Sequence, residues 1–448
     1  MQLDDRTTSI YPPGTLVSGD AGYDEARITF NGILDRRPAA IVPCRTTDDV
    51  VAAVRAARAA DLPIAVRGGG HSVAGHGIAD GALVVSLASM RGVTVDPEAR
   101  LAHAGGGALW EDLDGATTAH GLGVTGGTFV DTGIGGLTLG GGIGWLMPLI
   151  GLTCDNLVEA EVVTADGSIV VAGPDGDPDL LWALRGGGGN FGVVTRFTYR
   201  LTPLRPIVGG RIRYEPTAAR ALLERVDEIV ADRPEALMPT LTAGVNDEVG
   251  FGVGILLGIV DGKDPEPILE RLRTGLPVTL DRVGPISYAE LQGLTGLLPF
   301  GLRHYWKGHF LRSFDGDLFE ALVDVCRPET AVGHSFLLLE GIVGAGRTEP
   351  AGGAAFGQRA ARWNASALGV WETPEEDAAG IAWARRVADL LESSSLSGGG
   401  YVNYSPVDET ADRVRAAYGD ERFARLRAVK QRYDPDNRFR FNHNIPPG

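Results

Sequence analysis

The chain has 448 residues, 44% of them hydrophobic and 22% charged, which is typical of a folded globular protein with two or three domains. Its 57 acidic residues outnumber 41 basic ones, and the net charge of −16 argues against nucleic acid or an anionic membrane as the main partner. The three cysteines are widely spaced, so we expect neither a disulfide framework nor a zinc knuckle. The start MQLDDRTTSIYPPG lacks a signal-peptide pattern and no window is apolar enough to span a membrane, so we expect a cytoplasmic protein.

Short strands alternate with helices in the first part of the chain. The first expected helix, 46–62, begins with Thr46 and Asp49 at the spacing of a capping box. Residues 157–173 are expected to form a hairpin that turns at residues 166–167. The remaining elements expected here are strands at 39–44, 63–69, 82–87, 93–96 and 192–201, and helices at 108–122 and 177–187.

The pattern changes between residues 204 and 395, where longer strand runs alternate with amphipathic helices. The expected strands are 210–216, 249–260, 303–314, 334–346 and 361–371. The expected helices are 219–232, 266–276, 319–326 and 376–393. This arrangement predicts an α+β layer, in which helices cover an antiparallel sheet.

The 64 glycines are about twice the usual ~7% and they are clustered. Apolar residues interrupt the clusters at 121–144 and 184–192, so neither is a flexible linker. A third stretch, VRGGGHSVAGHG at 66–77, places His71 directly after three glycines. A metal ligand, a catalytic base, a phosphate-binding loop and an ordinary turn are all compatible with a histidine in such a loop.

The spacing of these motifs disfavours several common sites. A dinucleotide fingerprint G-x-G-x-x-G would need a glycine where Val73 or Thr138 stands, and a phosphate-binding G-K-[ST] loop would need a lysine that neither glycine cluster has. His71 and His76 are five residues apart with no third ligand at metal spacing, so no metal site is expected.

Taken together, VRGGGHS, the cluster at 121–144, RGGGGNFGVVT, YVNY and the tail YDPDNRFRFNHNI resemble the FAD-linked oxidases of the vanillyl-alcohol oxidase superfamily. More closely, the chain is similar to the berberine-bridge-enzyme-like family from about residue 38 to the end. The resemblance implies an α+β fold with a PCMH-type FAD-binding domain at 1–203, an inserted substrate domain at 204–395, and a segment at 396–448 that returns to the FAD domain.

The resemblance also implies which residues hold the cofactor. The family's histidine that bonds covalently to the 8α-methyl group of the flavin corresponds to His71. The backbone N–H groups of 68–70 are suited to form a nest for the pyrophosphate. The other implied FAD-binding residues are Arg67, Gly68, Gly69, Gly70, Ser72, Gly75, His76, Gly127, Thr128, Gly133, Gly135, Gly136, Gly140, Gly141, Gly142, Val194, Asn442 and Asn444.

Some members of the family attach FAD a second time, through a cysteine in the motif G-T-C-P-x-x-G-x-G-G. This chain has GTFVDTGIGG at that place, with Phe129 where the cysteine would be, and Cys154 lies in a different segment. We therefore expect one covalent histidyl link rather than two. Ile134 of the same run is expected beside the flavin ring, where its bulk could restrict oxygen.

The segment YVNY supplies the candidate catalytic residues that the resemblance implies. Tyr404 is the first candidate for the base, Asn403 is expected to orient substrate or flavin, and Tyr401 lies beside them in sequence. A tyrosine needs a neighbouring cation to act as a base at neutral pH, and Lys307 is a candidate for that cation. An ordinary half-exposed strand face explains Lys307 equally well.

The expected reaction is two-electron oxidation of a small organic substrate, with oxygen reoxidising the flavin. Phe336 and Leu338 alternate with Glu340 on one strand, and Asn364 alternates with Ser366 on another. This largely apolar set favours an apolar or aromatic alcohol or phenol over an amine, while a sugar stays open. The alternatives are a dehydrogenase with another electron acceptor and a flavin-holding protein without turnover, and either a monomer or a homodimer is expected.

Overall fold

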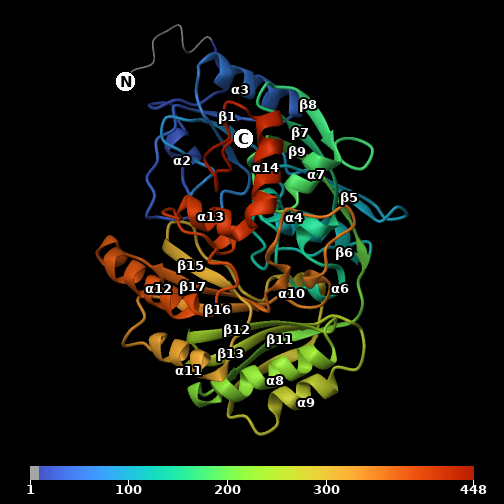
Figure 1. Cartoon of the computed structure of the whole chain (residues 1–448), viewed down its shortest axis with the longest axis vertical. Helices are drawn as coiled ribbons and strands as arrows, with labels where there is room; N and C mark the ends of the chain where they lie inside the picture. The colour runs from blue at the N-terminus through green and yellow to red at the C-terminus, as the bar shows by residue number, and fades with distance from the viewer. Residues whose placement is uncertain (1–9) are drawn as a thin grey trace.

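The computed structural model describes residues 10–448, so the first nine residues of the stretch inspected for a signal peptide lie outside it. Figure 1 shows the chain as an upper and a lower half. The blue-to-green part of the chain, up to β9, forms the upper half, the yellow-green-to-orange part forms the lower half, and the red C-terminal helices return to the upper half.

A small parallel sheet begins the upper half. Its strands have the order β1 (Ala40–Pro43), β3 (Leu83–Ser86), β2 (Ile64–Arg67). Helix α3 (Thr47–Ala59) connects β1 to β2. Thr46 and Asp49 form the predicted capping box, because each side chain accepts a hydrogen bond from the other residue's backbone N–H. The sheet positions the histidine loop, since β2 ends at Arg67 and the three glycines follow it.

An antiparallel sheet completes the upper half. Its order is β4 (Val93–Asp96), β5 (Leu101–Gly105), β9 (Val193–Arg200), β7 (Leu157–Val163), β8 (Ile169–Ala172), and β6 (Leu122–Gly123) pairs separately with β10 (Thr202–Pro203). The predicted hairpin is present as β7–β8. The helices of this half are α2 (Tyr23–Ala26), α4 (Trp110–Thr118), α5 (Ile134–Leu139), α6 (Met147–Ile150) and α7 (Pro178–Leu184).

A seven-stranded antiparallel sheet forms the centre of the lower half. Its order is β14 (Val278–Ile286), β11 (Ile207–Tyr214), β13 (Gly250–Ile259), β12 (Leu237–Asn246), β16 (Phe336–Gly341), β17 (Trp363–Trp371), β15 (Arg303–Leu311). Helices α8 (Ala219–Asp232), α9 (Glu266–Arg273), α11 (Gly316–Val325) and α12 (Asp377–Glu392) cover its outer face, and α10 (Tyr288–Gln292) lies near the upper half. The predicted α+β class is confirmed.

Side-chain alternation along the strands separates the two faces of this sheet. On β15, Tyr305 and Leu311 join the apolar core beneath the helices, whereas Trp306 and Phe310 belong to clusters that contain Tyr404 and Tyr401. One face of the sheet is therefore packed against helices, and the other faces the upper half of the molecule.

The C-terminal segment connects the two halves. The short turn η6 (Val402–Tyr404) contacts both halves, because Asn403 donates to the Leu137 carbonyl and Tyr404 donates to Glu340 on β16. Helices α13 (Ala411–Tyr418) and α14 (Asp420–Tyr433) follow it. Lys430 on α14 is fully buried, where its Nζ lies 2.6 Å from the Asp434 carboxylate and donates to the Asn190 carbonyl at 2.8 Å. This buried ion pair fixes the glycine loop before β9 against the C-terminal helix. The predicted domain limits at residues 203 and 395 stay predictions.

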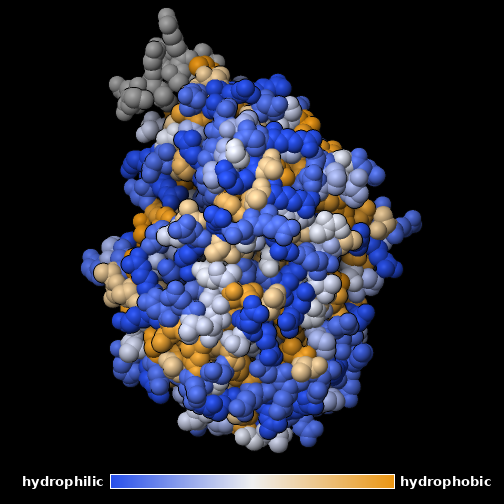
Figure 2. Space-filling view, viewed as in Figure 1, coloured by the Kyte–Doolittle hydropathy of each residue, from blue (hydrophilic) through white to orange (hydrophobic). Residues whose placement is uncertain are grey.

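The molecular surface in the view of Figure 2 is mostly hydrophilic, with apolar side chains in separate small patches. In residues 10–448 every helix is too short or too polar to span a bilayer.

Candidate active site

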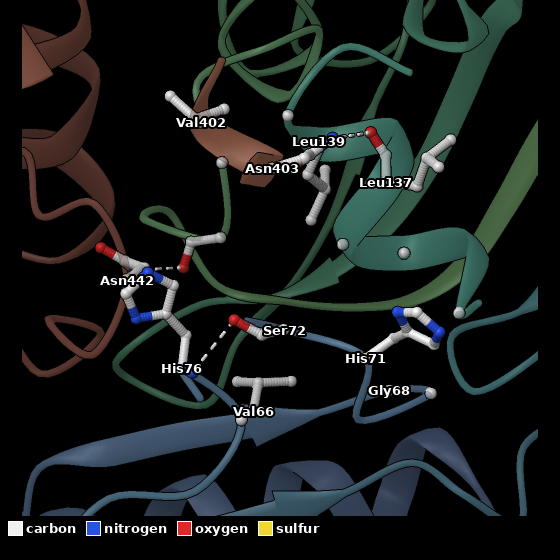
Figure 3. Close-up of a pocket in the computed structure, with 18 of the residues that line it drawn as sticks. Val66, Gly68, His71, Ser72, His76, Leu137, Leu139, Val402, Asn403 and Asn442 are labelled. Carbon is white, nitrogen blue, oxygen red and sulfur yellow. Dashed lines mark hydrogen bonds between the residues drawn. The ribbon is translucent and has the colours of Figure 1, made fainter. Parts of the chain in front are cut away.

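A cavity of about 260 Å3 lies in the upper half, and Trp306 of β15 reaches its wall from the lower half. Glycine-rich segments form much of its wall, and they come from the loop after β2, from the region around α5 and from the loop before β9. Figure 3 shows the histidine loop on one side of this space and α5 with the Val402–Asn403 turn on the other. Distant parts of the sequence therefore meet here because two sheets present their loops to each other.

Close packing explains why the loop at residues 68–70 and the segment at Gly133 need glycine where they meet. A Cβ atom on Gly69 would lie 2.5 Å from the backbone nitrogen of Gly133, and Gly70 adopts a φ of 74°. The backbone N–H groups of residues 69–72 donate to no acceptor within residues 10–448. These donors are available to an anionic group in the cavity.

His71 stands at one end of the cavity, with its side chain only 8% exposed. Its ring stacks on Phe30 with a centroid separation of 4.0 Å, and the ring of Phe129 lies 5.9 Å away. The Nε2 atom is 3.4 Å from a carboxylate oxygen of Asp131, without the alignment of a hydrogen bond. The ring is therefore held flat between apolar groups, and its Nε2 has no hydrogen-bond partner among residues 10–448.

His76, at the other end of the same loop, lines the cavity beside His443. His443 donates through Nε2 to the Val402 carbonyl at 2.7 Å, and Nε2 of His76 lies 3.4 Å from that nitrogen. Burial lowers the pKa of both histidines, and their mutual repulsion lowers that of His76 further. Both rings are neutral at pH 7 and join the loop to the C-terminal tail.

Behind Tyr404, which lines the cavity, lies a buried carboxyl group, Glu340 on β16, which is 3% exposed. Its Oε1 accepts from the Tyr404 hydroxyl at 3.2 Å and its Oε2 accepts from Asn364 Nδ2 at 2.8 Å. Burial raises the pKa of Glu340 to about 7, although the two hydrogen bonds act in the opposite direction. The carboxyl group can therefore take up and release a proton near neutral pH.

Aromatic rings pack around Tyr404, the hydrogen-bond partner of this carboxyl group. The ring of Tyr404 contacts the edges of Trp306, at 5.4 Å between centroids, and Tyr401, at 5.0 Å, and all three line the cavity. Asn403 is fixed by donating to the Leu137 carbonyl at 3.1 Å and to the Tyr401 hydroxyl at 2.9 Å. The site thus combines one ionisable carboxyl group with a rigid, mostly apolar wall.

Comparison with known proteins decides the family. The FAD binding domain family matches residues 38–173, and the family described as berberine and berberine like matches residues 400–446. Over 443 residues the chain is 33% identical to (R)-6-hydroxynicotine oxidase of Paenarthrobacter nicotinovorans, covering 96% of this chain and 95% of that protein. The chain belongs to the berberine-bridge-enzyme-like family of FAD-linked oxidoreductases.

Two solved structures illustrate the similarity of fold. The crystal structure of 6-hydroxy-D-nicotine oxidase from Arthrobacter nicotinovorans is 30% identical, with a TM-score of 0.87 over 100% of both chains. Glucooligosaccharide oxidase from Acremonium strictum, described as carrying a 6-S-cysteinyl, 8α-N1-histidyl FAD, is 23% identical, with a TM-score of 0.85 over 97% of both chains. The predicted FAD cofactor and PCMH-type fold are confirmed.

The residues present fit FAD. The free N–H groups of residues 69–72 suit phosphate oxygens, and apolar side chains such as Leu137 and Val194 suit flat rings. Buried polar atoms without partners, including Nε2 of His71 and Oδ1 of Asn442, lie on residues that line the same cavity. In the oxidoreductase these groups would hold the dinucleotide within this cavity.

Most residues predicted to bind FAD or substrate do line the cavity, and their individual roles stay predictions. They are Arg67, Gly68, Gly69, Gly70, His71, Ser72, His76, Gly127, Thr128, Gly133, Gly135, Gly136, Gly140, Val194, Tyr401, Asn403, Tyr404 and Asn442. Asn403 packs against Gly140 so closely that a Cβ there would lie 2.0 Å from its Oδ1.

Four predicted FAD-binding residues lie away from the cavity: Gly75, Gly141, Gly142 and Asn444. The glycines serve backbone packing instead. A Cβ on Gly75 would lie 2.4 Å from the Leu34 side chain, and Gly142 has a φ of 87° while donating its N–H to the Tyr401 hydroxyl at 2.9 Å. Ile134, expected beside the flavin ring, is fully buried in the core of the upper half.

The predicted pairing of Lys307 with Tyr404 is wrong. Lys307 lies on the helix-covered face of β15, as do its neighbours at alternate positions: the Tyr305 hydroxyl binds Asp408, and His309 contacts Ser395. Trp306, one residue earlier, is the side chain that faces Tyr404. The charged neighbour of Tyr404 is the Glu340 carboxyl group, and burial together with this carboxyl group raises the pKa of Tyr404 well above its usual value.

Sequence reasoning missed several residues of the site. Glu340 and Asn364 appeared only as members of alternating strand faces, and Trp306 was given no role. Pairing of β15, β17 and β16 brings these three residues together, and the sequence does not show that pairing. Sequence reasoning quoted His443 within the tail and Gly188 within the RGGGGNFG run without assigning them a role, although both line the cavity. A buried charged residue within an otherwise apolar strand was the available signal for Glu340.

Proposed function

We propose that this protein is an FAD-dependent oxidase that removes two electrons from a small organic substrate, favouring an apolar or aromatic alcohol, with oxygen as the final acceptor. When bound, FAD accepts a hydride from the substrate at its N5 atom. The observation that carries the proposal is the buried Glu340 carboxyl group, hydrogen-bonded to Tyr404 beside a cavity whose loops fit FAD.

Glu340 is the proposed base, in place of Tyr404. Its pKa of about 7 makes it substantially ionised at neutral pH, whereas burial keeps the Tyr404 phenol protonated. Tyr404 donates its hydroxyl hydrogen to Oε1 and can accept a proton from a substrate hydroxyl at the same oxygen. Tyr404 then relays the substrate proton to Glu340, while Asn364 holds the second carboxylate oxygen.

The wall of the site supports the proposed substrate class. Leu338 and Trp306 belong to one apolar cluster with partly buried Phe336 and Tyr404. Glu340 is the one carboxyl group on this part of β16, so an amine cation would find a single counter-charge and an apolar surrounding. In an alcohol, a ring or alkyl chain would contact the apolar wall while the hydroxyl group gives its proton to the proposed base.

His71 is the proposed covalent tether. One of its ring nitrogens would bond to the 8α carbon of FAD, with loss of one hydrogen from the ring and one from the methyl group, and oxygen would take up both hydrogens with their electrons as hydrogen peroxide. A single link is favoured because Phe129, whose ring centroid lies 5.9 Å from that of His71, occupies the position of the second-link cysteine. None of Cys44, Cys154 and Cys326 lines the cavity.

The test is anaerobic mixing of the holoenzyme with alcohols, phenols, sugars and amines while the visible flavin absorbance is followed. Bleaching by an alcohol and rapid return of colour in air are expected. Bleaching with slow return would favour a dehydrogenase with another acceptor. Absence of bleaching by every class would overturn the proposal.

A further inference from the structure

Two arginines face the same way on β11, toward the upper half of the molecule. Arg211 and Arg213 alternate with Ile212 and Tyr214, whose side chains enter the core beneath the helices. Both arginines line a second cavity of about 220 Å3, together with Thr242, Asn246, Thr295 and Phe336 among others. This cavity opens on the same face of the sheet as Glu340.

Arg213 lies flat across its neighbouring strand. Its Nη1 donates to the Thr242 hydroxyl at 3.3 Å, and its Nη2 donates to the carbonyls of Gly244 at 2.7 Å and Gly252 at 3.1 Å. Glycine is required beneath it, since a Cβ on Gly254 would lie 2.8 Å from the Arg213 Cδ. The side chain is 7% exposed, and its Nε–H has no acceptor within residues 10–448.

Neither arginine has an acidic partner in the described chain. Among residues 10–448 no carboxylate oxygen lies within ion-pair distance of Arg211 or Arg213, and Arg211 makes one hydrogen bond, from Nη2 to the Leu294 carbonyl at 3.0 Å. Burial and the neighbouring Arg211 lower the pKa of Arg213 to about 10, so the guanidinium stays charged at neutral pH. A buried cation with a free donor and no counter-ion favours binding of an anion.

The sheet places this cation close to the proposed catalytic carboxyl group. Thr242, which the Arg213 guanidinium reaches, pairs directly with Leu338, and Leu338 is two residues from Glu340. Thr242 is therefore one strand spacing and two residues from Glu340, which corresponds to about 8 Å between their backbones, and Arg213 Nη1 reaches Thr242 from the β11 side. Phe336 lines the arginine cavity and shares an apolar cluster with Trp306 and Tyr404 of the main cavity.

We propose that this second cavity binds a carboxylate of the substrate, so that the enzyme oxidises an aromatic or apolar acid at a carbon remote from its carboxylate. The inference rests on the proposed oxidation at the Glu340 site. Arg213 Nε and the free donors of Arg211 supply planar N–H groups, which match the two oxygens of a carboxylate. The apolar rings between the cavities would contact the body of the substrate.

The test measures binding of simple acids to the holoenzyme by calorimetry. The probes are phenylacetate, 3-phenylpropionate and 4-phenylbutyrate, each compared with its neutral amide. At least one acid is expected to bind about tenfold or more tightly than its amide. Arg211→Gln should weaken the binding of that acid by about 10- to 100-fold and leave the binding of its amide unchanged.

Two further variants keep the test decisive. Arg225→Gln removes an exposed arginine from α8 on the opposite face of the sheet and should leave binding of the acid within twofold of the unmodified protein. Arg213→Lys keeps the charge but loses the planar guanidinium group, and it should weaken binding of the acid at least fivefold. Thermal melting of each variant shows that it has folded.

Equal binding of all three acids and their amides would overturn the inference, as would equal effects of Arg211→Gln and Arg225→Gln. Tighter, Arg211-dependent binding of phenyl phosphate than of any acid would overturn the carboxylate in favour of a phosphate ester. Failure of the oxidase proposal is seen separately, because acid binding dependent on Arg211 with no flavin bleaching by any substrate would leave the anion site standing without the reaction.

Discussion

Replacing Glu340 with glutamine tests the proposed base. The substitution keeps the size of the side chain and a donor or acceptor for Tyr404 and Asn364, but removes the ionisable group. Because a general base contributes about 100- to 10,000-fold to a rate, kcat/KM for the best substrate should fall by at least about 100-fold. Anaerobic stopped-flow measurement of flavin bleaching gives this value directly.

The pH dependence of the bleaching rate in the unmodified enzyme provides a second test of Glu340. With a pKa of about 7, the ionised fraction of Glu340 rises about tenfold between pH 6 and pH 8, and the bleaching rate should rise with it. Glu340→Gln should abolish this rise, whereas Tyr404→Phe, which leaves the carboxyl group in place, should keep a rise with pH at a lower rate. If Glu340→Gln keeps a bleaching rate within threefold of the unmodified enzyme and keeps the rise near pH 7, the proposed role of Glu340 is refuted.

The same substitution should change stability with a defined sign. Burial raises the folded-state pKa of Glu340 from 4.5 to about 7, so the folded protein binds more protons than the unfolded chain between these values. Stability from this group is present below pH 4.5 and is lost as pH rises through 7. Glu340→Gln should therefore gain up to about 3 kcal/mol relative to the unmodified protein on going from pH 4.5 to pH 8. Denaturant unfolding at the two pH values measures the difference, and an unchanged difference contradicts the buried pKa.

Two other substitutions follow from the site's geometry. Lys307→Met should change kcat/KM by less than twofold, because Lys307 faces the helices rather than the cavity; a loss of tenfold or more would restore its predicted catalytic role. Gly140→Ala places a Cβ 2.0 Å from Oδ1 of Asn403 and should displace that side chain, lowering the melting temperature and slowing bleaching at least tenfold. Gly115→Ala on α4 is its control, since Gly115 does not line the cavity and a Cβ there meets nothing within 4 Å; equal effects of the two would contradict the account of Asn403.

Much of the fold could be predicted from local patterns. The start of α3 at Thr46, the β7–β8 hairpin and the helices of the lower half follow from capping, turn and periodicity signals. Strands β12 and β14 were missed. The first contains Pro239 and Gly244, and the second is a partly exposed edge strand with a Gly-Pro pair, so neither shows strong alternation.

The cofactor loops could be predicted from the sequence because their glycines stand in continuous, recognisable runs. The catalytic side of the site could not, because it depends on strand register and on which strand face points to the cavity. Lys307 and Trp306 are adjacent in sequence, yet only Trp306 reaches Tyr404. Pairing of Glu340 with Asn364 across β16 and β17 joins residues from separate strands, and no local pattern states that register.

Mass measurement of the denatured, intact protein tests the central claim most directly. We predict an increase by the mass of one FAD less two hydrogen atoms, located by digestion to the peptide that contains His71. His71→Ala should remove the increase while leaving Cys44, Cys154 and Cys326 unmodified. An unmodified mass with all yellow colour released into solution, or a second linkage at any residue, would contradict the account.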